Sequence, residues 1–178
     1  MNCDFITKGK KVGCIGALAG VKNIYVGLYA DYGITATAQE VASIGTLAET
    51  FKYEFSSNTQ GLTETPSINY DNGSLFVTQV LVGNLPIQDA ETQEELFLMM
   101  RNRLVIFVED YNNNIKLMGY VNSAKATNGS AVTGLAKGDL NGYTFEFTAE
   151  EPTFAPFLTS TAKTELLASV SNSYIGGV

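Results

Sequence analysis

The sequence predicts a mainly β protein: an antiparallel β-sandwich or barrel with one flanking α-helix. Short segments with a period of two alternate with turns rich in Gly, Asn and Asp along most of the 178 residues, a pattern typical of a sandwich or barrel. One stretch, between two predicted strands, has the caps and apolar spacing of a helix. The chain also contains no histidine, so the residue that most often moves protons or binds zinc is missing.

The first predicted strand covers residues 23–29, an apolar and aromatic segment that ends before the turn signal at 31–33. Residues 34–47 are rich in Ala and Thr without a firm period, and we expect a loop or a weak helical turn there. Residues 51–55 alternate between aromatic and charged side chains, as a half-buried strand does. A polar loop, or the tip of a long hairpin, is predicted for residues 56–66.

A second group of strands leads into the helix. Residues 67–70 predict a short strand, and Asp71-Asn72-Gly73 predicts the turn that follows it. The next strand, residues 75–82, is apolar on both faces, so we expect one face to meet the core and the other a second layer or a neighbouring subunit. Asp89 or Thr92 is predicted to cap the helix. Its apolar stripe consists of Leu96, Phe97, Met99 and Met100.

The segment after the helix continues the β pattern. Further strands are predicted over residues 104–108, 115–121, 131–135 and 143–149. Prolines then break the chain, and residues 158–170 are predicted to add a last edge strand. The whole chain, residues 1–178, is predicted to be a single domain with an N-terminal arm over about 1–22 and a C-terminal tail over about 158–178.

Composition and charge limit the partners. Charged residues make up 16% of the chain, against about a quarter in a typical soluble domain. Sparse charge suits a surface that neighbours cover, although a merely polar surface is an equal alternative. The net charge is −7 without a basic patch, which predicts repulsion of phosphate backbones. No apolar run is long enough for a membrane-spanning helix, so we expect no membrane partner, and Cys3 and Cys14 are expected to be reduced thiols.

The residues do not predict an enzyme. Gly-spaced segments within residues 13–20 lack the Lys and Ser or Thr of a phosphate-binding loop. The turn from Asp110 to Asn114 offers oxygen ligands without the spacing of a calcium loop. The carboxylate pairs Glu109-Asp110 and Glu150-Glu151 are expected to be solvated turn acids rather than a hydrolytic pair. We therefore expect no catalytic residues, no cofactor and no metal.

A family resemblance rests on one long run, Ala131 to Pro152, which reads AVTGLAKGDLNGYTFEFTAEEP and is followed by Ala155-Pro156-Phe157. It resembles the closing segment of virion proteins of tailed phages, in particular phages and prophages of Bacteroidetes that include the crAss-like phages. The resemblance covers roughly residues 50–157. The upstream order is similar as well, through Phe51–Phe55, Thr63-Glu64-Thr65, Ser74–Gln79, the helix and Leu104–Asp110.

This resemblance implies a tail-tube-like fold with two antiparallel sheets, a flanking helix and protruding hairpins. It implies a non-enzymatic subunit of a homo-oligomeric ring, sixfold or twelvefold, in a tail tube or a neck ring below the portal. The implied location is the virion, after assembly in the cytoplasm of the bacterial host. Implied partners are neighbouring ring, portal or tail proteins, and phage DNA that passes without specific binding. Interface or lumen candidates are Glu64, Asp71, Leu75, Val77, Asp110 and Asp139.

Two other functions remain open at this point. The first is a carbohydrate- or host-binding β-sandwich that decorates a virion, with an exposed aromatic platform at Tyr111, Tyr120 or Tyr143. The second is a hydrolase built on carboxylates, which the missing histidine disfavours.

Overall fold

The structure of the protein, a computed structural model, describes residues 8–11, 16–30, 34–37, 39–45, 49–55, 59–173 and 175. Cys3, Cys14 and the turn predicted at 31–33 lie outside the described residues. The described chain is mainly β, and its strands form two largely antiparallel sheets. The predicted fold class is therefore confirmed.

The larger sheet, called the central sheet below, has seven strands in the order β2-β3-β11-β8-β7-β1-β4. Every neighbouring pair is antiparallel except β3 and β11, which run parallel. Its strands are β1 (Val21–Leu28), β2 (Thr35–Thr37), β3 (Glu40–Ser43), β4 (Phe51–Glu54), β7 (Leu104–Asp110), β8 (Ile115–Met118) and β11 (Phe157–Leu158).

The smaller sheet, called the outer sheet, has four strands in the order β5-β6-β10-β9, all antiparallel. They are β5 (Gly61–Asn69), β6 (Ser74–Pro86), β9 (Lys125–Val132) and β10 (Gly142–Glu151). β6 is the longest strand of the described chain at 13 residues, or about 40 Å at roughly 3.3 Å per residue. It pairs with β10 over its second part and with β5 over its first.

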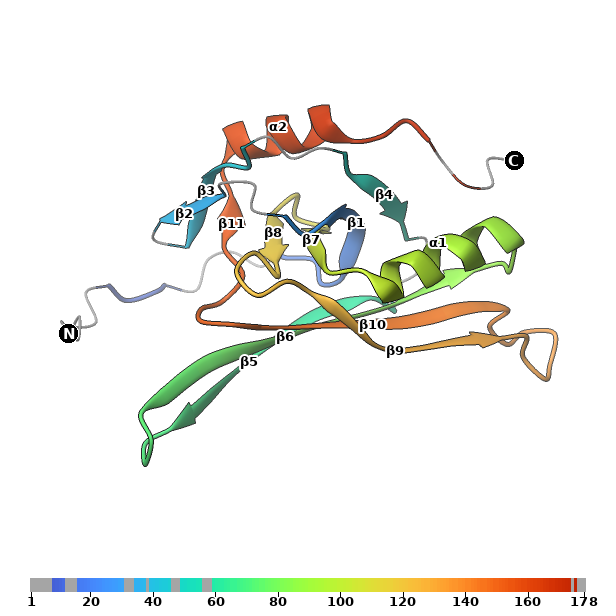
Figure 1. Cartoon of the computed structure of the whole chain (residues 1–178), viewed down its shortest axis with the longest axis horizontal. Helices are drawn as coiled ribbons and strands as arrows, with labels where there is room; N and C mark the ends of the chain where they lie inside the picture. The colour runs from blue at the N-terminus through green and yellow to red at the C-terminus, as the bar shows by residue number, and fades with distance from the viewer. Residues whose placement is uncertain are drawn as a thin grey trace.

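The sheets stack in layers, with helix α2 (Ser160–Ser169) on the far side of the central sheet from the outer sheet (Figure 1). A first core lies between the two sheets and is closed by helix α1 (Ala90–Arg101). A second core lies between the central sheet and α2. β7 serves both, because Ile106 and Val108 enter the first core while Val105 and Phe107 enter the second.

Helix α1 lies where the sequence predicts it. The Asp89 carboxylate accepts hydrogen bonds from the Thr92 backbone N–H and the Thr92 hydroxyl, each at 2.7 Å. Asp89 is therefore the cap, and Thr92 supplies its donors. Of the predicted apolar stripe, Leu96 and Met99 are buried, whereas Phe97 and Met100 are exposed. Part of the stripe thus remains uncovered by the chain itself.

Two helices, rather than the single one predicted, are present in the described chain. Residues 158–170 do not add a strand along their length; after the short β11 they form α2, which Thr159 caps. Ala162 and Leu166 lie one helical turn apart and bury completely in the second core. Burial of this narrow face stabilises a helix whose composition gives little amphipathic signal.

Other boundaries also differ from the sequence-based expectation. Residues 34–47 contain β2 and β3, and much of the loop predicted at 56–66 belongs to β5. The strand predicted at 131–135 lies earlier in the chain, as β9, because Gly134 has a positive φ of 71° that ends the extended backbone. The turn predicted at Asp71-Asn72-Gly73 is present, with Gly73 at a φ of 68°.

Candidate assembly surface

The outer sheet leaves one face uncovered. Side chains alternate between faces along a strand, so Tyr143, Phe145 and Phe147 of β10 point into the first core, and the Thr and Glu residues at positions 144 to 150 point away from it. We call the outward side the open face. Its side chains are Thr63 and Thr65 on β5, Thr78, Val80, Val82 and Asn84 on β6, Thr144, Glu146, Thr148 and Glu150 on β10, and Lys125, Thr127, Asn128 and Ser130 on β9.

Hydroxyl groups on the open face bind one another across strands. Ser130 and Thr144 share a hydrogen bond of 2.7 Å, and Thr127 and Thr148 share one of 3.0 Å. The Thr127 hydroxyl also lies 2.9 Å from a carboxylate oxygen of Glu146. The face therefore presents a mostly uncharged polar surface whose formal charges are the two glutamates and the lysine named above.

Both edges of the outer sheet are open. Within the described chain, β5 pairs with β6 alone and β9 pairs with β10 alone. An edge strand presents backbone N–H and C=O groups that another strand can pair with. The open face is thus bordered on both sides by strands able to extend the sheet into another chain.

A long hairpin projects from the outer sheet (Figure 1, lower left). The pairing of β6 with β10 stops at Val77, and from there to the turn β6 pairs only with β5. Ile68 and Leu75 face each other in this last part. We call residues 68–76 the hairpin tip; its exposed apolar side chains are Ile68, Tyr70, Leu75 and Phe76, with 56%, 89%, 60% and 37% exposure.

Polar side chains from the outer sheet hold the base of this hairpin against the central sheet. Glu64 accepts a hydrogen bond of 2.6 Å from the Ala155 backbone N–H and forms an ion pair of 2.5 Å with Lys116 of β8. Gln79, directly opposite Glu64 in the pairing of β5 with β6, accepts from the Gly119 N–H. At this end of the sandwich, these polar contacts replace the apolar first core. We call Glu64, Gln79 and the groups they bind the clasp; it fixes the direction of the hairpin relative to the central sheet.

Glu151 completes the clasp. Its carboxylate accepts hydrogen bonds from the Asn122 N–H at 2.9 Å and the Val121 N–H at 3.2 Å. The residue is 1% exposed, and this burial raises the pKa of Glu151 above its ordinary value, while the Asn122 and Val121 N–H groups offset part of the rise. Glu151 is therefore a buried acid, not the solvated turn acid that the sequence predicts.

The structure brings four of the predicted candidates together on one hairpin. Glu64 belongs to the clasp, and Val77 is 3% exposed, so both side chains are engaged within the chain. Asp71 and Leu75 lie at the hairpin tip and are exposed. Of the four, these two face solvent and can meet another molecule.

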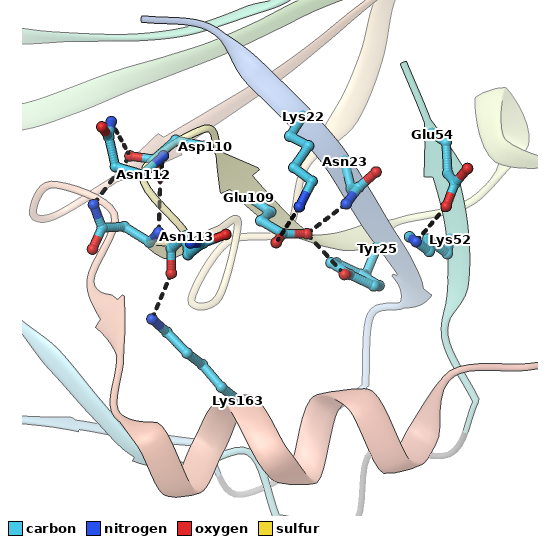
Figure 2. A network of polar contacts seen from close by, with 11 residues as sticks. Lys22, Asn23, Tyr25, Lys52, Glu54, Glu109, Asp110, Asn112, Asn113 and Lys163 are labelled. Carbon is cyan, nitrogen blue, oxygen red and sulfur yellow. Dashed lines mark hydrogen bonds and ion pairs between the residues drawn. The ribbon is translucent and has the colours of Figure 1, made fainter. Parts of the chain in front are cut away.

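Asp110 is the last residue of β7, directly before the turn to β8, in the polar network of Figure 2. Its carboxylate accepts from the N–H groups of Asn112 and Asn114, each at 2.8 Å. Burial raises the pKa of Asp110, but the hydrogen bonds from Asn114 and Asn112 outweigh this effect and lower it below its ordinary value. Within the same network, Lys163 of α2 donates to the Asn113 carbonyl. Asp110 thus shapes a turn.

Asp139 likewise stabilises a loop, the one between β9 and β10 at the other end of the outer sheet. Its carboxylate accepts from the Leu135 and Ala136 N–H groups at 3.0 and 2.8 Å. These hydrogen bonds lower the pKa of Asp139. Asp110 and Asp139 are not brought together with the hairpin candidates.

Sequence reasoning missed most of the open face. The alternation of residues 143–149 predicts that Thr144, Glu146 and Thr148 share a side, and the structure agrees. The contribution of β5 was missed because its Thr, Pro and Asn residues are typical of a loop. The contribution of β9 was missed because its residues are exposed and small.

Among the described residues, no three Asp, Glu or Cys side chains gather as a metal site would require. Neither described helix has the length and hydropathy needed to cross a membrane. No protein-family model matches the sequence, and comparison with curated proteins and with solved structures gives no significant match. The resemblance to phage virion proteins therefore stays a prediction.

Proposed function

We propose that this chain is a non-enzymatic structural subunit of a tailed-phage virion, part of a ring or tube that conducts DNA, either in the tail tube or in the neck. Copies would sit side by side in the ring, with the open face of each outer sheet toward a central channel. Neighbouring ring, portal or tail proteins of the virion would then contact the ends of the ring.

The observation that carries this proposal is an uncovered polar sheet face with an open strand on each side. A monomeric sandwich gains nothing from two free edges, which are prone to non-specific pairing. In a closed ring, each β5 edge meets the β9 edge of the next copy, and both edges of every outer sheet are used. Such contacts are head-to-tail, and they close when the rotation between copies divides a full turn.

The chemistry of the open face suits DNA that must slide without binding. Affinity for DNA comes mainly from Lys and Arg that neutralise phosphates. The open face has Lys125 as its only cation, together with Glu146 and Glu150. Hydroxyl groups such as those of Thr144 and Thr148 keep the surface hydrated, and they carry no positive charge that would bind phosphates.

Two of the three tyrosines predicted as a carbohydrate-binding platform are engaged in the cores of the chain. Tyr143 is buried in the first core, where its hydroxyl donates to the Asp89 carbonyl at 3.0 Å. Tyr120 packs against the second core, on the other side of the central sheet. Tyr111, in the turn between β7 and β8, is the predicted platform residue that remains at the surface. A single half-buried ring favours this function less than the open face favours a ring.

Negative-stain electron microscopy of the purified chain tests the proposal. We expect rings or tubes with a central channel wide enough for duplex DNA. A homogeneous monomer at high concentration would overturn the assembly.

The position of the open face needs a second test. We expect rings of Thr144→Lys and Thr148→Lys variants to retain duplex DNA at low salt and release it at high salt, since new ammonium groups would line the channel. The matched control is Ala168→Lys, an exposed site on α2. If the control rings retain as much DNA as the open-face variants, the channel is not lined by this face.

A further inference from the structure

The chain contains three Asn-Gly pairs, at residues 72–73, 128–129 and 141–142. In such a pair the backbone nitrogen of glycine can attack the side-chain carbonyl carbon of asparagine, because glycine has no Cβ to crowd the approach. The attack forms a five-membered succinimide and releases ammonia, and water then opens the ring to aspartate or isoaspartate. The three pairs share this covalent chemistry, so the structure around each decides which of them reacts.

The first pair, Asn72-Gly73, lies in the turn of the hairpin tip. Both residues are exposed, and a Cβ built on Gly73 would meet no atom within 4 Å. Among the described residues, none accepts a hydrogen bond from the Gly73 N–H. The nitrogen that attacks is therefore accessible to solvent and is not held by another group of the described chain.

The Asn72 side chain is oriented by the turn itself. Its Oδ1 accepts a hydrogen bond of 3.0 Å from the Ser74 N–H. The Asn69 Oδ1 fixes the same turn by accepting from the Asp71 N–H at 2.9 Å. When nitrogen attacks the side-chain carbonyl, negative charge develops on its oxygen, and a fixed N–H donor there lowers the barrier. The Ser74 N–H is such a donor for Asn72.

The second pair, Asn128-Gly129, is held in the extended backbone of β9. The two residues pair with Glu146 and Phe145 of β10. The Gly129 N–H donates to the Asn128 Oδ1 at 2.9 Å, and this contact directs the hydrogen to the oxygen instead of the nitrogen to the carbon. Ring closure needs rotation about the bond from Cα to the carbonyl carbon of Asn128, which the pairing with β10 opposes.

The third pair, Asn141-Gly142, stands at the start of β10. Gly142 is buried and pairs with Pro86 on one side and Val132 on the other. A Cβ at Gly142 would lie 2.1 Å from the Leu85 carbonyl oxygen, so the backbone of β6 packs closely against it. The Asn141 carbonyl also accepts from the Ile87 N–H at 2.7 Å. The reaction here requires this end of the sheet to open.

We propose that Asn72 is a site of spontaneous deamidation in the folded chain, and that the outer sheet protects Asn128 and Asn141. Each event consumes one water, releases one ammonia and leaves a carboxylate next to Asp71. The hairpin strands carry no Lys or Arg from residue 61 to 86, so no cation of the hairpin neutralises the added charge. Isoaspartate also adds a carbon atom to the backbone of the turn. This chemistry belongs to the single chain and goes beyond the proposed ring.

Peptide mapping by mass spectrometry tests this site. The full-length chain is incubated in mildly alkaline buffer, either folded or unfolded in guanidinium chloride, and deamidation is followed at each Asn-Gly pair. In the unfolded chain the three pairs should react at similar rates. In the folded chain we expect Asn72 to react at least as fast as when unfolded. Asn128 and Asn141 should react at least about tenfold more slowly, because their reacting atoms are held apart.

The test variant is Asn72→Gln, which keeps a carboxamide but needs a larger ring for the same attack. It should lose most of the ammonia release and the more acidic form that anion-exchange chromatography separates, whereas the matched control Asn128→Gln should retain both. Circular dichroism confirms that each variant is folded. Slower reaction of Asn72 in the folded than in the unfolded chain, or equal rates at Asn72 and Asn128 in the folded chain, would overturn this inference. Either result leaves the ring proposal intact.

Discussion

The two sheets differ in how they use their faces. In the central sheet, β7 buries Ile106 and Val108 on one side and Val105 and Phe107 on the other, so both faces are covered within one chain. In the outer sheet, β10 buries Phe145 and Phe147 and presents Thr and Glu on the opposite side. The central sheet is thus a complete scaffold, and the outer sheet is complete on one face only.

This difference separates stability from function. Hydrophobic burial on two faces makes the central sheet the part that holds the chain folded. The outer sheet contributes one face to that core and retains a polar face, two open edges and a projecting hairpin. Substitutions on the two sides should therefore differ in which measurement they change: the free energy of unfolding or the state of assembly.

The largest effect on stability is expected inside the central sheet. Phe107 is fully buried in the second core, and Phe107→Ala should lower the free energy of unfolding by about 3–5 kcal/mol, measured by urea denaturation. The matched control is Phe97→Ala, which removes an exposed ring and should change it by less than about 0.5 kcal/mol. If both variants lowered the free energy of unfolding by similar amounts, Phe107 would not be buried in a second core beneath α2.

A smaller loss is expected at the clasp between the sheets. Glu64→Ala removes the acceptor of the Ala155 N–H and the partner of Lys116, and should lower the free energy of unfolding by about 1–3 kcal/mol. The neighbouring control, Thr63→Ala on the open face, should have little effect. If Glu64→Ala were as mild as its control, the clasp would not hold the hairpin base, and the direction of the hairpin would need another explanation.

The clasp also predicts a dependence on pH. The pKa of Glu151 is raised in the folded state, so the folded chain binds more protons than the unfolded chain between the ordinary and the raised pKa. Stability from this group is complete below the ordinary pKa and is lost as the pH rises through the raised one. Urea denaturation across pH 4 to 7 should show this loss in the wild type.

The Glu151→Gln variant should lack that loss, so its stability should decline less over the same range of pH. Asp110 has the opposite sign, because its lowered pKa stabilises the folded chain above the ordinary value and the contribution is lost as the pH falls. An unchanged pH dependence in Glu151→Gln would show that another group titrates there. The Asp110→Asn variant serves as the comparison, because it removes a carboxyl whose contribution to stability depends on pH in the opposite direction.

Strong local patterns in the sequence predicted several strands and one helix correctly. The apolar run of β7 and the alternation of residues 143–149 each correspond to one observed strand, and Asp89 caps α1 as one of the two predicted residues. These features depend on short-range preferences for burial and capping. The fold class followed from them without any long-range information.

The missed elements depend on contacts between distant parts of the chain. Helix α2 is held by Ala162 and Leu166 against the second core, and its sequence has little of the amphipathic periodicity that identifies a surface helix. β5 contains Pro66, which suggests a loop, yet an edge strand tolerates a residue without an N–H donor. The open face was only partly predicted for the same reason, since it joins four strands that the sequence does not place side by side.

The smallest effect on stability is expected on the open face, and it gives the sharpest comparison within one strand. Thr148→Val keeps the shape of the side chain and removes the hydroxyl that lies 3.0 Å from Thr127, so the free energy of unfolding should change by less than about 0.5 kcal/mol. Phe147→Ala, one residue away on the buried side, should cost about 3–5 kcal/mol. A large loss from Thr148→Val would mean that a single chain already covers this face. A small loss means that the face is free in one chain and available to a channel or a neighbour.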